Sequence, residues 1–234
     1  MDILFLITAR GGSKGIQGKN IKLLNSKPLI CYSIDVARKF VSDDLICVSS
    51  DDEEIIETAE NYGLKIPFIR PKNLASDDTG SNDVILHALK YYQGKRNIDV
   101  VVLLQPTSPF RLVKHVKESL DLYNNNIDAV MSVKITQANP YQLLYVQNKD
   151  GFIEKIIKGF DFERRQDLPK VFEINGAVYV FNVQSLMKQK ISEFTKIKHY
   201  EMPELNSVDI DTPMDWAWAE FLLEKKMVKF DYEK

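Results

Sequence analysis

Cysteine, histidine and long apolar runs are scarce in this chain. Its 234 residues include two cysteines and three histidines. Cys31 and Cys47 lack the spacing of a metal site and fall in segments expected to be buried, which favours reduced thiols over a disulfide or a nucleophile. His87, His115 and His199 show no ligand or triad spacing, so we expect no acid–base chemistry based on histidine.

Signals for membranes and nucleic acids are also missing. No apolar stretch approaches the roughly 20 residues that span a bilayer, and the first residues lack the basic start of a secretory signal. The net charge is −2, from 31 Lys and Arg against 33 Asp and Glu, which argues against a nucleic-acid or anionic-membrane partner. We therefore expect a cytoplasmic protein.

Apolar, strand-like runs alternate with amphipathic, helix-like runs over the first 133 residues. The expected strands are Ile3–Thr8, Leu45–Ser49, Ile66–Ile69, Asp99–Leu104 and Ala129–Val133. The expected helices begin near Pro28, at Asp51 or Asp52, and near Asn82 and Val113. This alternation predicts an α/β fold with a three-layer, doubly wound, mainly parallel sheet. In such sheets, ligands bind beyond the carboxyl ends of the strands.

The pattern changes after Lys134. Segments Gln142–Gln147 and Phe152–Ile157 indicate a β-hairpin, because a short polar turn separates them. A strand at Ala177–Phe181, a short helix near Gln184–Lys190 and a terminal helix at Met214–Met227 follow. The length suits one substantial domain.

The loop after the first strand holds an unusual group of glycines and cations. Its members are Arg10, Gly11, Gly12, Lys14, Gly15, Gly18 and Lys19. Glycine lets backbone N–H groups approach a ligand closely, and such groups together with Arg and Lys bind anions. The loop fits neither the Walker pattern nor the dinucleotide fingerprint. It predicts a polyphosphate site, with a cationic surface turn as the alternative.

A second polar run directly follows the strongest strand. Gln105, Thr107, Ser108 and Arg111 offer an amide, two hydroxyls and a guanidinium at the expected binding edge, and two prolines restrict the backbone. The alternative is a polar turn that caps the next helix.

A pair of aspartates lies near the end of the sequence. In an extended segment, Asp209 and Asp211 point to the same side, and two adjacent carboxylates repel unless a cation lies between them. Beside a triphosphate, Mg²⁺ (or Mn²⁺) is the cation that such a pair of carboxylates would bind. The alternative is a helix N-cap before Pro213, and both can hold if Thr212 is the cap.

These runs resemble motifs of the CMP-N-acylneuraminate synthetases, cytidylyltransferases that activate sialic acids and related nine-carbon sugar acids. The similar segments are the glycine loop, with Gln17 at a usual proline, the run Leu103–Arg111, the Asp209–Asp211 pair, Arg165–Pro169, and Asn175–Tyr179, with Val178 for isoleucine. The resemblance implies a fold of the nucleotide-diphospho-sugar transferase type in one domain, residues 1–234. It also implies a homodimer, with residues 134–172 as a small dimerisation subdomain.

The resemblance also implies a reaction, in which CTP and a 2-keto sugar acid give the CMP-sugar and pyrophosphate. It implies nucleotide binding by Arg10, Gly11, Gly12, Ser13, Lys19, Asn20, Arg70 and Ser81. It implies contact with the sugar acid by Gln105, Thr107, Ser108, Arg111, Arg165, Asn175 and Tyr179. Asp209 and Asp211 would hold the metal, and these two with Arg10 and Lys19 would be catalytic.

Several alternatives remain at this stage. The guanidinium of Arg165 can hold the sugar carboxylate through two hydrogen bonds, but it could also form a salt bridge at an interface. Tyr179 could be plain core. The run Asn175–Tyr179 favours a neuraminate or legionaminate substrate over pseudaminate. Another sugar nucleotidyltransferase of this fold, such as a CMP-pseudaminate or CMP-Kdo type, and a non-catalytic nucleotide-binding protein are the alternative functions.

Overall fold

A six-stranded sheet forms the centre of the molecule. The computed structural model describes residues 2–76, 79–160 and 164–232, without the side chain of residue 165. The sheet order is β10-β6-β9-β5-β1-β4. Its strands are β1 (Ile3–Thr8), β4 (Ile46–Ser49), β5 (Val100–Leu103), β6 (Ala129–Ile135), β9 (Phe172–Asn182) and β10 (Ile197–Glu201). All neighbours are parallel except β9, which is antiparallel to β5 and to β6. The prediction of a mainly parallel sheet is confirmed.

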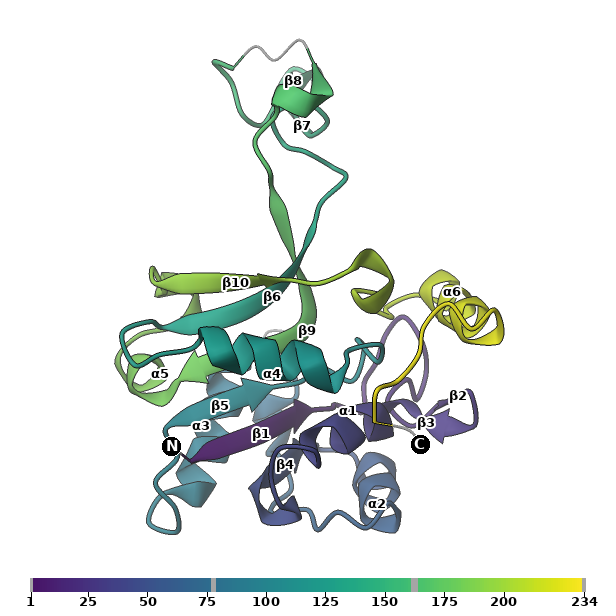
Figure 1. Cartoon of the computed structure of the whole chain (residues 1–234), viewed down its shortest axis with the longest axis vertical. Helices are drawn as coiled ribbons and strands as arrows, with labels where there is room; N and C mark the ends of the chain where they lie inside the picture. Colours follow the sequence, from purple (N-terminus) through teal and green to yellow (C-terminus); the bar gives the residue numbers. More distant parts are fainter. Residues whose placement is uncertain (1, 77–78, 161–163, 233–234) are drawn as a thin grey trace.

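Helices cover both faces of this sheet, as a doubly wound fold requires (Figure 1). The helices are α1 (Leu29–Ala37), α2 (Glu53–Asn61), α3 (Ser81–Tyr92), α4 (Val113–Leu122), α5 (Val183–Lys188) and α6 (Pro213–Glu224). Apolar residues of α1, α2 and α4 share one core with Phe5 and Ile7 of β1. Those of α3 and α5 share the other core with Leu4 and Leu6, because side chains alternate across a strand.

Helix ends follow the expected capping residues. The Asp52 carboxylate accepts a hydrogen bond from the Ile55 N–H at 3.0 Å and caps α2, and Gly63 after that helix has φ +84°. Among the residues that the structure describes, five 3₁₀ turns connect the elements, at Asp43–Leu45, Lys72–Leu74, Arg165–Asp167, Ile191–Glu193 and Glu204–Asn206. Within the described ranges, no helix has the length and apolarity to cross a membrane.

The fold differs from the sequence predictions at several elements. Residues 66–69 are described but are not in a strand, and Pro67 within them cannot donate a ladder hydrogen bond. Strand β10 was not predicted, because Ile197–Glu201 is an edge strand whose polar sequence is mostly exposed. Helix α6 ends at Glu224, three residues before the predicted end at Met227.

Two strands are longer than predicted and lead into a projecting arm. β6 continues to Ile135, and β9 already begins at Phe172. Between them the chain extends away from the sheet and carries the predicted hairpin, formed by β7 (Tyr145–Gln147) and β8 (Ile153–Lys155) (Figure 1). The structure also contains a small hairpin that was not predicted, of β2 (Leu23–Leu24) and β3 (Lys27–Pro28).

Candidate active site

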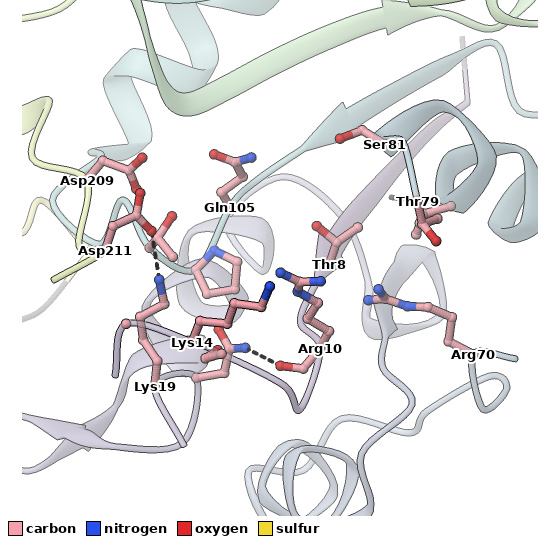
Figure 2. Close-up of a pocket in the computed structure, with 16 residues that line it drawn as sticks. Thr8, Arg10, Lys14, Lys19, Arg70, Thr79, Ser81, Gln105, Asp209 and Asp211 are labelled. Atoms are coloured by element: carbon pink, nitrogen blue, oxygen red, sulfur yellow. Dashed lines mark hydrogen bonds and ion pairs between the residues drawn. The ribbon is translucent and has the colours of Figure 1, made fainter. Parts of the chain in front are cut away.

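An open pocket of about 480 Å³ lies where β1 and β5 end (Figure 2). This is the expected position for a ligand of a doubly wound sheet. Predicted site residues that line the pocket are Arg10, Ser13, Lys19, Asn20, Arg70, Ser81, Gln105, Thr107, Asp209 and Asp211. The other lining residues are Thr8, Lys14, Gly15, Thr79, Val84 and Pro106.

The glycine loop and the aspartate pair meet at one side of this pocket. The Lys19 ammonium donates to Asp211 Oδ1 and to the Ile210 carbonyl, at 2.8 Å each. A Cβ atom on Gly15 would lie under 3.0 Å from the Asp211 carbonyl oxygen, so the loop approaches this segment at a position where only glycine fits. Two parts of the chain nearly 200 residues apart therefore form one site.

The two carboxylates are presented together by a short extended segment. Ile210 is buried between them, and its N–H donates to the Thr107 carbonyl at 2.8 Å, which ties this segment to the loop after β5. Both aspartates line the pocket and lie side by side in Figure 2. Thr212 caps α6 and Pro213 is its first residue, so the predicted cap and the predicted carboxylate pair coexist.

The surroundings of Asp209 and Asp211 fit a divalent cation whose remaining ligands are phosphate oxygens and water. Desolvation raises the pKa of Asp209, and the charge of Asp211 raises it further, while a hydrogen bond from Thr107 lowers it. In the described part of the chain, no group of three or more His, Cys, Asp or Glu side chains could hold a metal ion. Two carboxylates with the remaining positions left to phosphate oxygens and water is the usual arrangement for Mg²⁺.

Cations form the opposite wall. Arg10, Lys14 and Arg70 extend toward the same space in Figure 2. Arg70 is only 4% exposed, and its guanidinium donates to the hydroxyl and the carbonyl of Ser49 at the end of β4. Burial lowers the pKa of Arg70, the Asp51 carboxylate raises it and Arg10 lowers it. A wall with this charge favours a polyanion.

The loop glycines differ from the predicted nest. The Gly11 N–H donates to Asp51 Oδ1 at 3.3 Å instead of facing the pocket. A Cβ atom on Gly11 would lie under 3.0 Å from the Asp52 carboxylate, so glycine is required here for packing against the start of α2. Gly12 is likewise outside the pocket lining. The loop is held instead by Asn20, whose amide donates to the Arg10 carbonyl at 3.1 Å.

Arg111 and Ser108 are buried structural groups, contrary to the prediction that they face the substrate. Arg111 is 0% exposed and donates to the Ala177 carbonyl at 2.7 Å, to Ser33 Oγ at 2.6 Å and to the Gln105 carbonyl. Burial lowers its pKa to about 10. Ser108 Oγ donates to the Asn175 carbonyl at 3.2 Å. Both side chains hold the loop after β5 against its neighbours.

Asn175 is also buried, although it was predicted to contact the sugar acid. Its amide oxygen accepts from Ser132 Oγ at 2.6 Å, and its amide nitrogen donates to Ser207 Oγ at 2.9 Å. Tyr179 packs in the sheet, stacked on Phe181 with ring centroids 5.7 Å apart. The side chain of Arg165, the predicted partner of the sugar carboxylate, lies outside the described residues.

Six lining residues were not among the predicted site residues, and two of these, Lys14 and Pro106, were noted only as members of the loop and of the run after β5. Thr8 is the last residue of β1, so its place at the carboxyl end of a central strand was a usable signal. Gly15 was noted only as part of the loop. Thr79 lines the pocket from the segment before α3, and Val84 lines it from the start of that helix; neither was named as a site residue.

Comparison with known proteins identifies the family of this chain. Residues 4–229 match the family described as cytidylyltransferase. The chain is 31% identical over 226 residues to CMP-N,N'-diacetyllegionaminic acid synthase of Legionella pneumophila, covering 96% of this chain and 97% of that protein. It is 33% identical over 223 residues to pseudaminic acid cytidylyltransferase of Campylobacter jejuni, covering 95% and 96%.

Two further proteins are similar in part of their length or in fold alone. The N-acylneuraminate cytidylyltransferase of Escherichia coli is 32% identical over 227 residues, which are 96% of this chain and 52% of that protein. The solved structure of CMP:2-keto-3-deoxy-manno-octonic acid synthetase complexed with CTP has a TM-score of 0.70 and 16% identity, covering 97% of this chain and all of that one, a likeness of fold. As its motifs predicted, this chain belongs to the cytidylyltransferases, a family of nucleotidyltransferases.

Proposed function

We propose that the protein transfers the cytidylyl group of CTP to a nine-carbon 2-keto sugar acid of the neuraminate or legionaminate type, and that pyrophosphate is released. The observation that carries this proposal is the meeting of the cationic loop and the paired aspartates in one pocket. A triphosphate needs the cations, and a metal-assisted transfer needs the carboxylates. The matched family supports CTP as the nucleotide.

Asp209 and Asp211 are the groups that would hold the metal ion, Mg²⁺ or Mn²⁺. When bound, such an ion neutralises phosphate charge and makes a coordinated hydroxyl more acidic. Lys19 lies at the same point through its bond to Asp211, and it would balance the charge of the carboxylate and of a nearby phosphate. The positive charges of the metal ion and of Lys19 explain how two carboxylates could lie beside a bound triphosphate without repelling it.

In the proposed reaction, the hydroxyl oxygen on C2 of the sugar acid attacks the α-phosphorus of CTP. The new C2–O–P bond forms as the bond from the α-phosphorus to the bridging oxygen of pyrophosphate breaks, and the hydroxyl proton leaves to solvent. Arg10, Lys14 and Lys19 offset the charge that develops on the phosphoryl and leaving oxygens. Holding both substrates in one pocket supplies much of the remaining acceleration.

The nucleoside part would lie at the other end of the pocket. Arg70, Thr79 and Ser81 lie away from Asp209 and Asp211 in Figure 2, and Val84 also lines the pocket, so hydrogen-bonding groups and one apolar surface are available. An aromatic base and a ribose need this combination.

The proposal is tested with purified protein in a pyrophosphate-release assay. One series offers CTP, ATP, GTP and UTP with a fixed acid. A second series offers CTP with neuraminic, legionaminic, pseudaminic and the eight-carbon Kdo acids. We expect turnover with CTP and with a neuraminate or legionaminate acid. Preference for another nucleotide, or for pseudaminate or Kdo, would overturn the substrate assignment.

We also propose a homodimer formed through the arm, residues 134–172. The arm exposes a group of large apolar side chains, at Leu143, Leu144, Val146, Phe152, Ile153 and Ile156. An exposed apolar cluster of this kind marks an interaction surface. Light scattering should give twice the chain mass, and Phe152→Asp with Ile153→Asp should give the single mass. A wild-type protein that is monomeric at high concentration would refute this assignment.

The proposed location is the cytoplasm. Cys31 and Cys47 are both buried, unpaired thiols, which suits a reducing compartment. Fractionation of the producing cells, with the protein detected by antibody, tests this location.

A further inference from the structure

We propose that Gly176 is a positioning residue that fixes the Gln105 carboxamide in the pocket, at the part that receives the sugar acid. The inference rests on the proposed function and concerns how its site is built. Gly176 does not line the pocket itself. It would act through Gln105, which does line the pocket.

A pronounced irregularity of β9 brings Gly176 to this position. Met131 pairs with Tyr179 and Val133 pairs with Ile174, so β6 has only Ser132 where β9 has residues 175–178. The extra residues of β9 bulge out of the ladder toward the loop after β5. Bulges of this kind redirect a strand locally and are common beside active sites.

Buried hydrogen bonds hold this bulge in one conformation. Asn175 Oδ1 accepts from Ser132 Oγ at 2.6 Å and from the Ala177 N–H at 3.2 Å. The amide nitrogen of Asn175 donates to Ser207 Oγ at 2.9 Å. Ser132 Oγ also accepts from the Val178 N–H at 2.8 Å, so every residue at the base of the bulge is fixed. The predicted substrate residue Asn175 therefore acts as a brace.

Gly176 stands directly against the side chain of Gln105. Its φ is +72°, a conformation that favours glycine, and a Cβ atom here would lie under 3.0 Å from Gln105 Oε1. It would also lie 3.2 Å from Ser108 Oγ, which is tied to the Asn175 carbonyl. The space that a side chain would fill at Gly176 is occupied by the Gln105 carboxamide.

A single guanidinium prevents the two segments from moving apart. Arg111 donates both to the Gln105 carbonyl and to the Ala177 carbonyl, the residue after Gly176. A larger group at Gly176 could therefore not be relieved by separating the backbones. It would instead push the Gln105 side chain out of its position.

The Gln105 carboxamide lies on the same side of the pocket as Asp209 (Figure 2). A carboxamide both donates and accepts hydrogen bonds, so it suits the hydroxyl and acylamino groups of a sugar acid. Displacement of this group should weaken binding of the sugar acid. The cationic wall formed by Arg10, Lys14 and Arg70, on the opposite side of the pocket, should be unchanged.

The test compares Gly176→Ala with Gly94→Ala in steady-state kinetics. Gly94 has φ +79°, and no other described atom lies within 4 Å of an added Cβ, so it controls for the backbone strain alone. Gly176→Ala should raise KM for the sugar acid about three- to tenfold, the value of one hydrogen bond, with KM for CTP unchanged. Gly94→Ala should match the wild type in both constants.

A double-mutant cycle with Gln105→Ala shows whether the effect passes through the carboxamide. Gln105→Ala should raise KM for the acid by a similar factor, and adding Gly176→Ala to it should change this constant no further. Independent, multiplying effects would overturn the inference, as would equal kinetics of Gly176→Ala and Gly94→Ala. A selective rise in KM for CTP would also overturn it.

A further variant, Arg111→Lys, tests the same link if Gly176→Ala folds poorly. Arg111→Lys keeps the charge but loses the guanidinium geometry that joins the Gln105 and Ala177 carbonyls, and it should raise the same KM. Unchanged kinetics in Arg111→Lys would contradict the proposed link. A wild type that is inactive with every nucleotide and acid would overturn the proposed function and this inference with it, whereas an active wild type tests the inference alone.

Discussion

Gly15 offers the sharpest test of how the site is assembled. A methyl group at this position would lie under 3.0 Å from the Asp211 carbonyl oxygen, a backbone atom that cannot rotate away. Gly15→Ala therefore requires the loop or the aspartate segment to shift by about 1 Å or more. Overpacking of this kind costs about 1–3 kcal/mol of unfolding free energy. For a chain of this length, each kcal/mol corresponds to about 2–4 °C in Tm.

The effect on turnover should exceed the effect on stability. A displacement of about 1 Å in a catalytic arrangement can lower the rate by about a hundredfold, because the reacting groups no longer meet in line. We therefore expect Gly15→Ala to remain folded and to lose roughly 10- to 100-fold in kcat/KM in the pyrophosphate-release assay. Circular dichroism and thermal melting measure the folding of the same preparation.

Gly12→Ala provides the matched control in the same loop. No other described atom lies within 4 Å of a Cβ at Gly12, and alanine keeps the backbone N–H. This variant should remain within about threefold of the wild type in kcat/KM, since surface changes usually cost under about 0.5 kcal/mol. Wild-type activity and Tm in Gly15→Ala would refute the close approach of the loop to Asp211.

Three further predictions concern charge, metal and pH. Arg10→Ala should lower turnover by roughly two orders of magnitude without unfolding the protein, and wild-type turnover would defeat the proposed charge stabilisation. Removal of divalent ions with EDTA should abolish pyrophosphate release and added Mg²⁺ should restore it, whereas full activity in EDTA would contradict a metal on Asp209 and Asp211. The buried His115 accepts the Leu112 N–H through Nδ1, and desolvation lowers its pKa from 6.5 to about 4. Because the unfolded state then binds more protons between these values, stability should fall from pH 6.5 to pH 4, by up to about 3 kcal/mol. In urea titrations, His115→Asn should lose less stability over that range, and equal losses would refute the assignment.

Local patterns predicted the parts of the fold whose cause is local. Strand β1 at Ile3–Thr8 and helix α2 with its Asp52 cap follow from an apolar run and from a capping residue. Strand β10 could not be predicted in this way, because its polar residues become a strand only through pairing with β6. Tertiary pairing outweighs intrinsic propensity at such an edge.

The candidate site likewise has parts that the sequence predicts and parts that depend on distant contacts. Charge and the family resemblance together predicted that the loop cations and the aspartate pair would form one site, and Lys19 does contact Asp211. The burial of Arg111 was not predictable, because its partners Ser33 and Ala177 are 78 and 66 residues away. A guanidinium in a polar loop has the same sequence signature whether it contacts substrate or braces the backbone.

The bond from Lys19 to the Ile210 carbonyl spans 191 positions of the sequence. A nascent chain that has formed β1 and its loop still lacks the two carboxylates of the pocket until the aspartate segment is synthesised and docked. Nucleotide affinity is thus a late property of folding. A ligand held between the two segments would bind only the folded protein and would stabilise it against heat and proteolysis, by an amount that rises with the logarithm of ligand concentration once the site is largely occupied.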